Sequence, residues 1–311
     1  DTGSAAIQAV KDSDNIDIVV LHPANKISAY QRKQMTTVIQ PNVLNIAVEG
    51  SYDDCQRIAK ELLATNPFQR RIISLNSINW LRVMGQISYY VWLTKQFSSP
   101  INVAIPSGNF GNAYSAWYGR AHGLPISEIL CTTNVNDVLR RFIESGVLEP
   151  NKTQPSLSPS MDIQVASNFE RFLYYYFDQD SNRLCAFMAE FNETGNASIG
   201  GAPTDELFTA VAVGRGETLK SMAEAQANYD YILDPHTAVG YAATKAQGGG
   251  LSTPRICVAT AHPAKFPDAV IEATGVTPTH PSLEALSGLP VRKGHIDANI
   301  DAVKDYLAAR V

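Results

Sequence analysis

Short apolar runs alternate with helical patterns of apolar residues along the first third of this chain. Three runs rich in isoleucine, valine and leucine predict buried strands, at residues 16–21, 43–48 and 71–75. Helical spacing predicts three helices, at residues 28–38, 51–63 and 77 to about 97. Ser51 suits the N-cap of the second helix, because Asp53 and Asp54 follow in its first turn. The third helix has apolar residues on one face: Ile78, Leu81, Met84, Ile87 and Val91.

The same alternation continues through the rest of the chain. Further strands are predicted at residues 101–105, 126–132 and 255–259, and further helices at about residues 113–122, 135–144 and 299–310. Residues 151–160 are rich in proline and serine and are expected to form a loop. Three glycines at residues 248–250 indicate a flexible connection over residues 247–254. Strands separated by helices need right-handed crossovers, which implies parallel sheets covered on both faces.

These elements predict an α/β fold with two domains, each with a mostly parallel sheet flanked by helices. A length of 311 residues also favours two domains over one. We place a smaller domain at residues 1–97 and a larger one at residues 98–311. Residues 178–216 are less regular and are expected to form an insertion or a lid in the larger domain.

The composition excludes several classes of protein. The formal net charge is −5, so a nucleic-acid-binding surface is not expected. No apolar run approaches the roughly 20 residues that a membrane-spanning helix needs. The four cysteines are far apart and form no CxxC pair, which favours free thiols in the reducing cytoplasm. Acidic residues of the irregular stretch show no metal-ligand spacing: Glu190, Asp205 and Glu217.

The strongest local signal is the segment IPSGNFGN at residues 105–112, between an apolar strand and a helix. Open α/β sheets bind ligands at the carboxyl ends of their strands. Gly108 and Gly111 allow the backbone to turn and to approach a ligand closely. The N–H groups of this turn and the helix N-terminus would then form a cradle for a phosphate dianion. The alternative is a tight turn without a ligand.

A second signal is Thr260, which ends the apolar strand at residues 255–259. Its hydroxyl would point into a cleft at the carboxyl edge of the sheet. A hydroxyl can hydrogen-bond an unprotonated pyridine nitrogen, whereas an aspartate in that place would favour the protonated form. The alternative is a threonine that satisfies a backbone group of its own loop. Downstream, Lys265 suits a helix start better than a covalent link to a cofactor, and His236 either lines the cleft or caps a helix.

A third signal is a set of cationic and neutral donors near predicted helix starts. Lys26 and Arg82 would be the cations of an anion pocket. Its neutral donors would be Ser28, Ser77 and the amides of Asn76 and Asn79. The opening residues Thr2, Gly3 and Ser4 form another helix N-terminus suited to a carboxylate. Ordinary helix capping is the alternative for these sites.

Six segments follow one another along the chain in a distinctive order. They are DTGSAA from residue 1, KIS from residue 26, NSINWLR from residue 76, SGNFGN from residue 107, DPHTAVG from residue 234 and TAHPAKF from residue 260. This set resembles the threonine synthase family, and the resemblance spans residues 1 to about 268. The segments PSMDI at residues 159–163 and SNFER at residues 167–171 strengthen it.

The resemblance implies a pyridoxal-phosphate enzyme of fold type II, the tryptophan-synthase-β type, with two domains, the cofactor in the cleft and the larger domain binding it. It implies that O-phospho-L-homoserine and water are converted to L-threonine and phosphate. The cofactor-binding residues implied by the match are Ser107, Gly108, Asn109, Phe110, Gly111, Asn112 and Thr260. The substrate carries a carboxylate and a phosphate, so it needs two anion pockets. We assign Thr2, Gly3 and Ser4 to the carboxylate, and we assign to the phosphate Lys26, Ser28, Asn76, Ser77, Asn79 and Arg82.

The chain departs from the family pattern in one respect. The family's lysine that holds the cofactor lies in a His-Pro-Thr-x-x-Phe-Lys-Asp-like segment, and none of the eleven lysines here lies in one. We therefore expect the chain to be an N-terminally truncated part of the enzyme, with that lysine upstream of Asp1 and no catalytic residue of its own. Two alternatives are a hydroxy-amino-acid dehydratase of the same fold and a non-catalytic protein that binds a phosphorylated ligand. A dehydratase has no leaving phosphate to bind, so the donor set around Arg82 argues against it.

For the 311 residues alone, we expect weak, reversible cofactor binding at most, because the covalent link is missing. Absorbance spectra of the chain mixed with pyridoxal phosphate, before and after borohydride reduction, would test this. A stable Schiff-base band that borohydride fixes to these residues would contradict the expectation.

Overall fold

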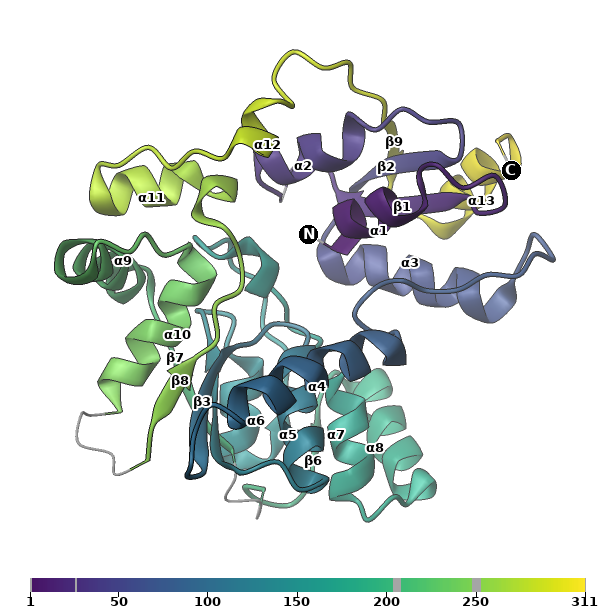
Figure 1. Cartoon of the computed structure of the whole chain (residues 1–311). Coiled ribbons are helices and arrows are strands. Elements are labelled where there is room, and N and C mark those ends of the chain that lie inside the picture. Colours follow the sequence, from purple (N-terminus) through teal and green to yellow (C-terminus); the bar gives the residue numbers. More distant parts are fainter. Residues whose placement is uncertain (1, 26, 204–207, 248–252, 311) are drawn as a thin grey trace. The chain divides into compact units, whose positions relative to one another are not determined.

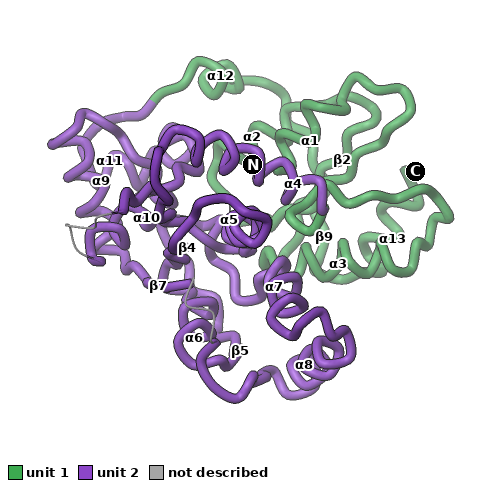
Figure 2. Tube along the Cα trace, turned by 60° about the horizontal axis from the view of Figure 1, so that its bottom comes forward, with its two compact units in different colours: residues 1–79, 279–311 green, residues 80–278 purple. Residues whose placement is uncertain are grey.

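The computed structural model describes residues 2–25, 27–203, 208–247 and 253–310, which form two compact units (Figures 1 and 2). Unit 1 consists of Asp1–Asn79 and Thr279–Val311, and unit 2 consists of Trp80–Pro278. The division differs from the boundary predicted after residue 97. The long helix belongs to unit 2, and the last part of the chain returns to unit 1 because its strand pairs with the sheet there.

Unit 1 is built on a three-stranded parallel sheet in the order β1-β2-β9. Its strands are β1 (Ile18–Pro23), β2 (Val43–Glu49) and β9 (Gly294–Asp297). Its helices are α1 (Thr2–Val10), α2 (Ala29–Thr36), α3 (Tyr52–Thr65), α12 (Pro281–Glu284) and α13 (Ile300–Ala308). Side chains of β2 alternate between two cores: Val43 packs with α1 and α2, and Ile46 packs with α3 and α13. Residues 71–75, predicted as a strand, form none, and Ile73 is 66% exposed.

Unit 2 is built on a four-stranded parallel sheet in the order β7-β4-β3-β8. Its strands are β3 (Ile101–Pro106), β4 (Ile126–Thr133), β7 (Phe208–Ala212) and β8 (Arg255–Cys257), and a separate antiparallel pair is β5 (Val147–Leu148) with β6 (Ala197–Ser198). All six residues of β3 are buried, as expected for a strand covered on both faces. The fold class predicted from the sequence, parallel sheets flanked by helices, is confirmed.

Helices cover both faces of this sheet (Figure 1). On one face lie α4 (Trp80–Thr94), α5 (Gly111–Ala121), α6 (Val138–Ser145) and α7 (Phe169–Tyr176), followed by α8 (Ser181–Thr194). On the other lies α10 (Pro235–Ala246), backed by α9 (Arg215–Tyr229) and α11 (Pro267–Thr274). Short 3₁₀ turns occur at η1 (Pro159–Met161) and η2 (Pro263–Lys265).

Two expectations for unit 2 were wrong. The described part of residues 178–216 is more regular than expected, because it contains the long helix α8 and the strand β7 of the four-stranded sheet. The apolar face assigned to α4 is also displaced, because Leu81 is 72% exposed and Met84 50% exposed. The face that packs against α5 instead carries Val83 and Tyr90.

Close packing of α10 on the sheet predicts a sensitive position. An added Cβ at Gly240 would lie 3.0 Å from both Cγ of Pro106 and Sγ of Cys257. We expect Gly240→Ala to destabilise the protein by about 1–3 kcal/mol through overpacking. Gly216→Ala in α9 is the matched control, since its Cβ would meet nothing within 4 Å and alanine favours helix. Denaturant unfolding of both variants checks this; equal midpoints would show that α10 can shift without cost.

Candidate functional site

The carboxyl ends of β3 and β8 lie side by side in unit 2. Ala104 pairs with Cys257, and the N–H of Val258 donates to the carbonyl of Ala104 at 2.9 Å. In the sheet, β4 and β7 lie on one side of β3, and β8 lies on its other side. The direction of winding therefore reverses between β3 and β8. Such a switch point is where open α/β sheets bind ligands. The glycine loop that follows β3 and Thr260, which follows β8, therefore begin at the same edge of the sheet.

The glycine loop leaves several backbone donors unused. Phe110 has a left-handed backbone with φ of 60°, and it precedes α5 without a side-chain cap. Among the described hydrogen bonds, none uses the N–H groups of Gly108, Asn109, Gly111 or Asn112 as donors. A Cβ at Gly108 would lie 2.8 Å from the carbonyl oxygen of Ser160, so only glycine fits there. The loop thus presents N–H groups at a helix N-terminus, as an anion cradle requires.

The side chain of Asn112 is held in one orientation by two tyrosines of α4. Its Oδ1 accepts hydrogen bonds from the hydroxyl of Tyr89 at 2.7 Å and from that of Tyr90 at 2.5 Å. Burial raises the pKa of both phenols, so both remain donors at neutral pH. Because Oδ1 receives both, the amide NH₂ of Asn112 faces away from the tyrosines as a further donor. Neither tyrosine is among the residues predicted for the site, although the adjacent pair Tyr89-Tyr90 on a predicted helix was a signal in the sequence.

Thr260 is exposed at the edge, and its backbone is fixed from α10. Its N–H donates to Oγ1 of Thr237 at 3.0 Å, and the two threonine hydroxyl oxygens lie 3.2 Å apart. The Thr237 hydroxyl in turn donates to a carboxylate oxygen of Asp234. Thr237 and Asp234 were not predicted as site residues, because within the helix-start pattern Asp-Pro-His-Thr only His236 was a candidate for the cleft.

Asp234 is a buried carboxylate surrounded by donors. It is the N-cap of α10 and accepts the backbone N–H groups of His236 and Thr237. Besides the Thr237 hydroxyl, it also accepts hydrogen bonds from Nδ1 of His236 and from the N–H of Ala261 at 3.4 Å. Burial alone would raise the pKa of Asp234, but the hydrogen bonds from His236 and Thr237 outweigh it and lower the pKa. Since Nδ1 of His236 donates to Asp234, Nε2 accepts the N–H of Ser160 at 3.2 Å. Asp234 thus links the start of α10 to the loops beside Thr260 and Gly108.

The comparisons with known proteins agree on one family. The family model described as "Threonine synthase, C-terminal" matches residues 237–307. The threonine synthase of Pseudomonas aeruginosa is 40% identical over 291 residues, which cover 91% of this chain and 62% of that protein, and that of Corynebacterium glutamicum is 34% identical, covering 99% and 67%. A solved structure of a PLP-bound threonine synthase from Brucella melitensis matches with a TM-score of 0.86 at 34% identity, over 100% of this chain and 68% of that one. The chain belongs to the threonine synthase family. It spans about two thirds of the length of the Corynebacterium and Brucella proteins and 62% of the Pseudomonas protein.

The substrate-site candidates of this chain divide between the two units. In unit 1, Thr2, Gly3 and Ser4 lie in α1, and a Cβ at Gly3 would lie 2.8 Å from Cγ1 of Val20, so this glycine packs α1 against β1. Ser28 is the N-cap of α2 and accepts the N–H of Gln31 at 3.1 Å. Lys26 lies outside the described residues.

The remaining candidates surround the start of α4. Asn76 Oδ1 accepts the N–H of Ile78 at 3.0 Å, and Asn79 donates its amide to the carbonyl of Ser74, so both stabilise the turn before α4, in which Ser77 also lies. Arg82 is half-buried in α4 of unit 2, where burial lowers its pKa. The structure therefore gives Ser28, Asn76 and Asn79 capping or turn roles, and their part in substrate binding stays a prediction.

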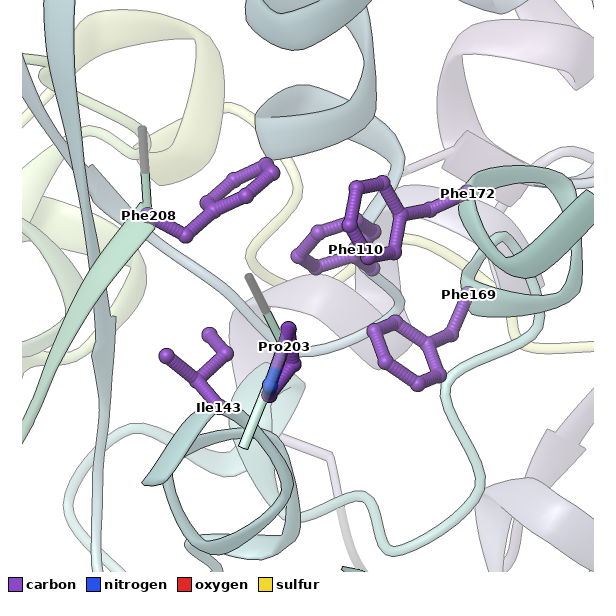
Figure 3. A pocket seen from close by; sticks show the side chains of 6 residues that line it. All are labelled: Phe110, Ile143, Phe169, Phe172, Pro203 and Phe208. Atoms are coloured by element: carbon purple, nitrogen blue, oxygen red, sulfur yellow. The ribbon is translucent and has the colours of Figure 1, made fainter. Parts of the chain in front are cut away.

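A small apolar cavity lies behind the glycine loop (Figure 3). It is lined by Phe110, Ile143, Phe169, Phe172, Pro203 and Phe208. Its lining has no titratable side chain and therefore offers no group for chemistry, while ring contacts with Phe169, Phe172 and Phe208 hold Phe110 in place. Elsewhere in the described part of the chain, no three histidine, cysteine or acidic side chains gather as a metal site, and no helix is long and apolar enough to span a membrane.

The environment of Asp234 predicts a pH-dependent stability. We expect Asp234→Asn to cost about 1–3 kcal/mol at pH 7, because an amide NH₂ would face donors. The folded pKa of Asp234 is depressed, so its contribution is complete above the unfolded pKa of about 3.9 and is lost as the pH falls through the folded value. Urea unfolding at pH 7, 5 and 3.5 should therefore show a constant difference between wild type and variant down to pH 5 and a smaller one in acid.

The matched control for this variant is Asp180→Asn. Asp180 is an exposed N-cap of α8, and asparagine caps as well as aspartate. We expect a negligible change in the free energy of unfolding. A loss equal to that of Asp234→Asn would show that capping, rather than the buried donor set, accounts for the effect.

Proposed function

We propose that the full-length protein is a threonine synthase, which converts O-phospho-L-homoserine and water to L-threonine and phosphate with pyridoxal 5′-phosphate. The observation that carries the proposal is the shared edge of β3 and β8, because the glycine loop with its unused backbone donors follows one of these paired strands and the exposed Thr260 follows the other. Family membership supports the same reaction, since the relatives at 34–40% identity are named threonine synthases. The four free cysteines are consistent with the proposed cytoplasmic location.

The residues present fit a phosphorylated cofactor. The unused N–H groups from Gly108 to Asn112 suit a phosphate dianion at the N-terminus of α5. The contact between Gly108 and Ser160 leaves no room for a Cβ, so the loop backbone is kept in place for close approach. Thr260 would face the ring nitrogen. When bound, pyridoxal phosphate supplies an electron sink for charge that develops at the substrate α-carbon.

The remaining tasks fall to the protein. The cradle residues fix the cofactor phosphate, while Asn112, aimed by two tyrosines, adds a neutral donor without bringing a fixed charge. The substrate phosphate and carboxylate need separate donors, which we assign to the candidates around Arg82 and to Thr2–Ser4. We assign the lysine that holds the cofactor to the rest of the full-length protein, because the chain spans only 62–68% of its relatives.

A charge reversal in the cradle tests the proposal. Asn112→Asp keeps the oxygen that faces Tyr89 and Tyr90 but places a negative oxygen where the NH₂ faced the ligand. We expect the full-length variant to lose cofactor affinity by roughly ten- to a hundredfold, as for the loss of a hydrogen bond to a charged group of about 1.5–3 kcal/mol. Cofactor absorbance, and threonine and phosphate release from O-phosphohomoserine, would be measured.

The matched control is Asn182→Asp, an exposed position of α8 outside the cradle, which should leave both readouts unchanged. Unaltered cofactor binding in Asn112→Asp would show that the glycine loop does not bind the cofactor phosphate. Turnover of threonine in place of phosphohomoserine would instead favour a hydroxy-amino-acid dehydratase.

A further inference from the structure

The hydrogen bonds behind Thr260 have a direction that can be worked out from the number of hydrogens available. The Thr237 hydroxyl carries one hydrogen, and two oxygen atoms compete for it: a carboxylate oxygen of Asp234 and Oγ1 of Thr260. Asp234 accepts five hydrogen bonds and its pKa is lowered, so at neutral pH it is ionised and can only accept. The hydrogen of Thr237 therefore points to Asp234.

The direction at Thr237 fixes the direction at Thr260. With its hydrogen committed, Thr237 Oγ1 can only accept on its other side, and it already accepts the N–H of Thr260 at 3.0 Å. The two hydroxyl oxygens are 3.2 Å apart, so a hydrogen bond between them needs the hydrogen of Thr260. In this arrangement the exposed side of the Thr260 hydroxyl offers lone pairs to a ligand.

We propose that Thr260 accepts a hydrogen bond from the cofactor ring and that the relay Thr260–Thr237–Asp234 holds the pyridine nitrogen in its protonated form. The inference rests on the proposed function, and it reverses the role that the sequence predicts for Thr260, a hydrogen bond to an unprotonated nitrogen. An unprotonated nitrogen would need the hydrogen of Thr260, and two threonine oxygens 3.2 Å apart would then face each other with no hydrogen between them.

The charges around Asp234 support this direction. Lys265 of η2 is half-buried and interacts electrostatically with Asp234, a cation that favours the ionised carboxylate. The thiol of Cys257, at the end of β8, has its pKa raised to about 12 by burial and by Asp234, so it is neutral and does not compete for protons. On the other side, His236 donates Nδ1–H to Asp234, and beyond it Asp162 lies in the loop that carries Ser160. Among these groups, His236 and Thr237 donate hydrogen bonds to Asp234 and Lys265 is a cation, and these three favour the ionised carboxylate.

The relay has a chemical consequence. A protonated ring withdraws electrons from the substrate α-carbon more strongly than a neutral one, and hydrogen bonds at the ring nitrogen are the means by which a protein sets this property. The buried carboxylate would act on the ring through two hydroxyl groups, without being placed next to it. Thr237 and Asp234 are accordingly positioning residues for the reaction.

The test uses the full-length enzyme loaded with pyridoxal phosphate labelled with ¹⁵N in the ring, whose chemical shift moves strongly on protonation. We expect a protonated nitrogen in the wild type near neutral pH. In Thr237→Val the relay is cut with little change of shape, and the titration midpoint of the nitrogen should fall by about one unit or more, a tenfold loss of proton affinity. Thr237→Ser restores the hydroxyl and should restore the wild-type shift.

The control is Thr244→Val in the same helix, whose hydroxyl donates only to the carbonyl of Gly240 at 2.8 Å, and it should leave the nitrogen unchanged. An unprotonated nitrogen in the wild type would overturn the inference by itself, even if Thr237→Val failed to fold. A wild-type shift in Thr237→Val would overturn it as well. Failure of the wild type to take up the cofactor would refute the proposed function, and the inference with it.

Discussion

The candidate site depends on one pairing, that of the short strand β8 with β3. Three residues of β8 pair with β3, and the bond from Val258 to Ala104 extends the ladder to the loop. Had β8 joined the opposite edge, beside β7, Thr260 would lie three strands from the glycine loop. So short a strand has few hydrogen bonds of its own to hold its register. Packing supplies the rest, because Gly240 lets α10 contact Pro106 of β3 and Cys257 of β8 together.

Burial of Asp234 in this position is tolerated for a definite reason. An isolated ionised carboxylate in the protein interior is strongly unfavourable, and hydrogen bonds offset that cost only when nearly every lone pair has a donor. Asp234 accepts hydrogen bonds from its own helix and from the loop after β8. If these segments separated, the buried carboxylate would lose part of its hydrogen bonds. The same carboxylate that could direct a proton relay therefore also fixes the geometry of the edge.

A comparable network holds the loop on the other side of His236. Asp162 accepts hydrogen bonds from Asn134, Asn136 and Ser156, although burial raises its pKa overall. This loop carries Ser160, whose carbonyl lies against Gly108 and whose N–H donates to His236. The cradle and the relay are thus joined through a polar framework, whereas Phe110 is fixed from behind by aromatic packing.

Much of the fold could be predicted from the sequence, because the strands β2, β3 and β4 are short, mostly apolar runs and Ser51 and Asp54 mark a helix start. The errors share a physical cause: local pattern does not report pairing partners. Residues 71–75 have the composition of a strand but no strand beside them, while β9, with the sequence GHID, pairs with β2 only because the chain returns from far away. The prediction that Leu81 is buried fails for the same reason. Helical spacing shows which residues share a face of the helix, but it does not show which face packs against α5.

Prediction of the site had a different limit. The glycine loop and Thr260 directly follow strand ends and could be found from the sequence. Asp234 and Thr237, however, contact the segment after β8 from 23 to 27 positions away in the chain.

The choice posed by the sequence between capping and ligand binding was also too narrow for the substrate candidates. A cap uses acceptors: Ser28 accepts the N–H of Gln31 through its oxygen, and Asn76 accepts through Oδ1. An anion needs donors, and the hydroxyl hydrogen of Ser28 and the NH₂ of Asn76 are not consumed by those bonds. A side chain that caps a helix is therefore held with its donors in a fixed direction, which is the state in which it loses least entropy on meeting a phosphate. Capping in unit 1 accordingly supplies the rigidity that an anion site would require and does not argue against one.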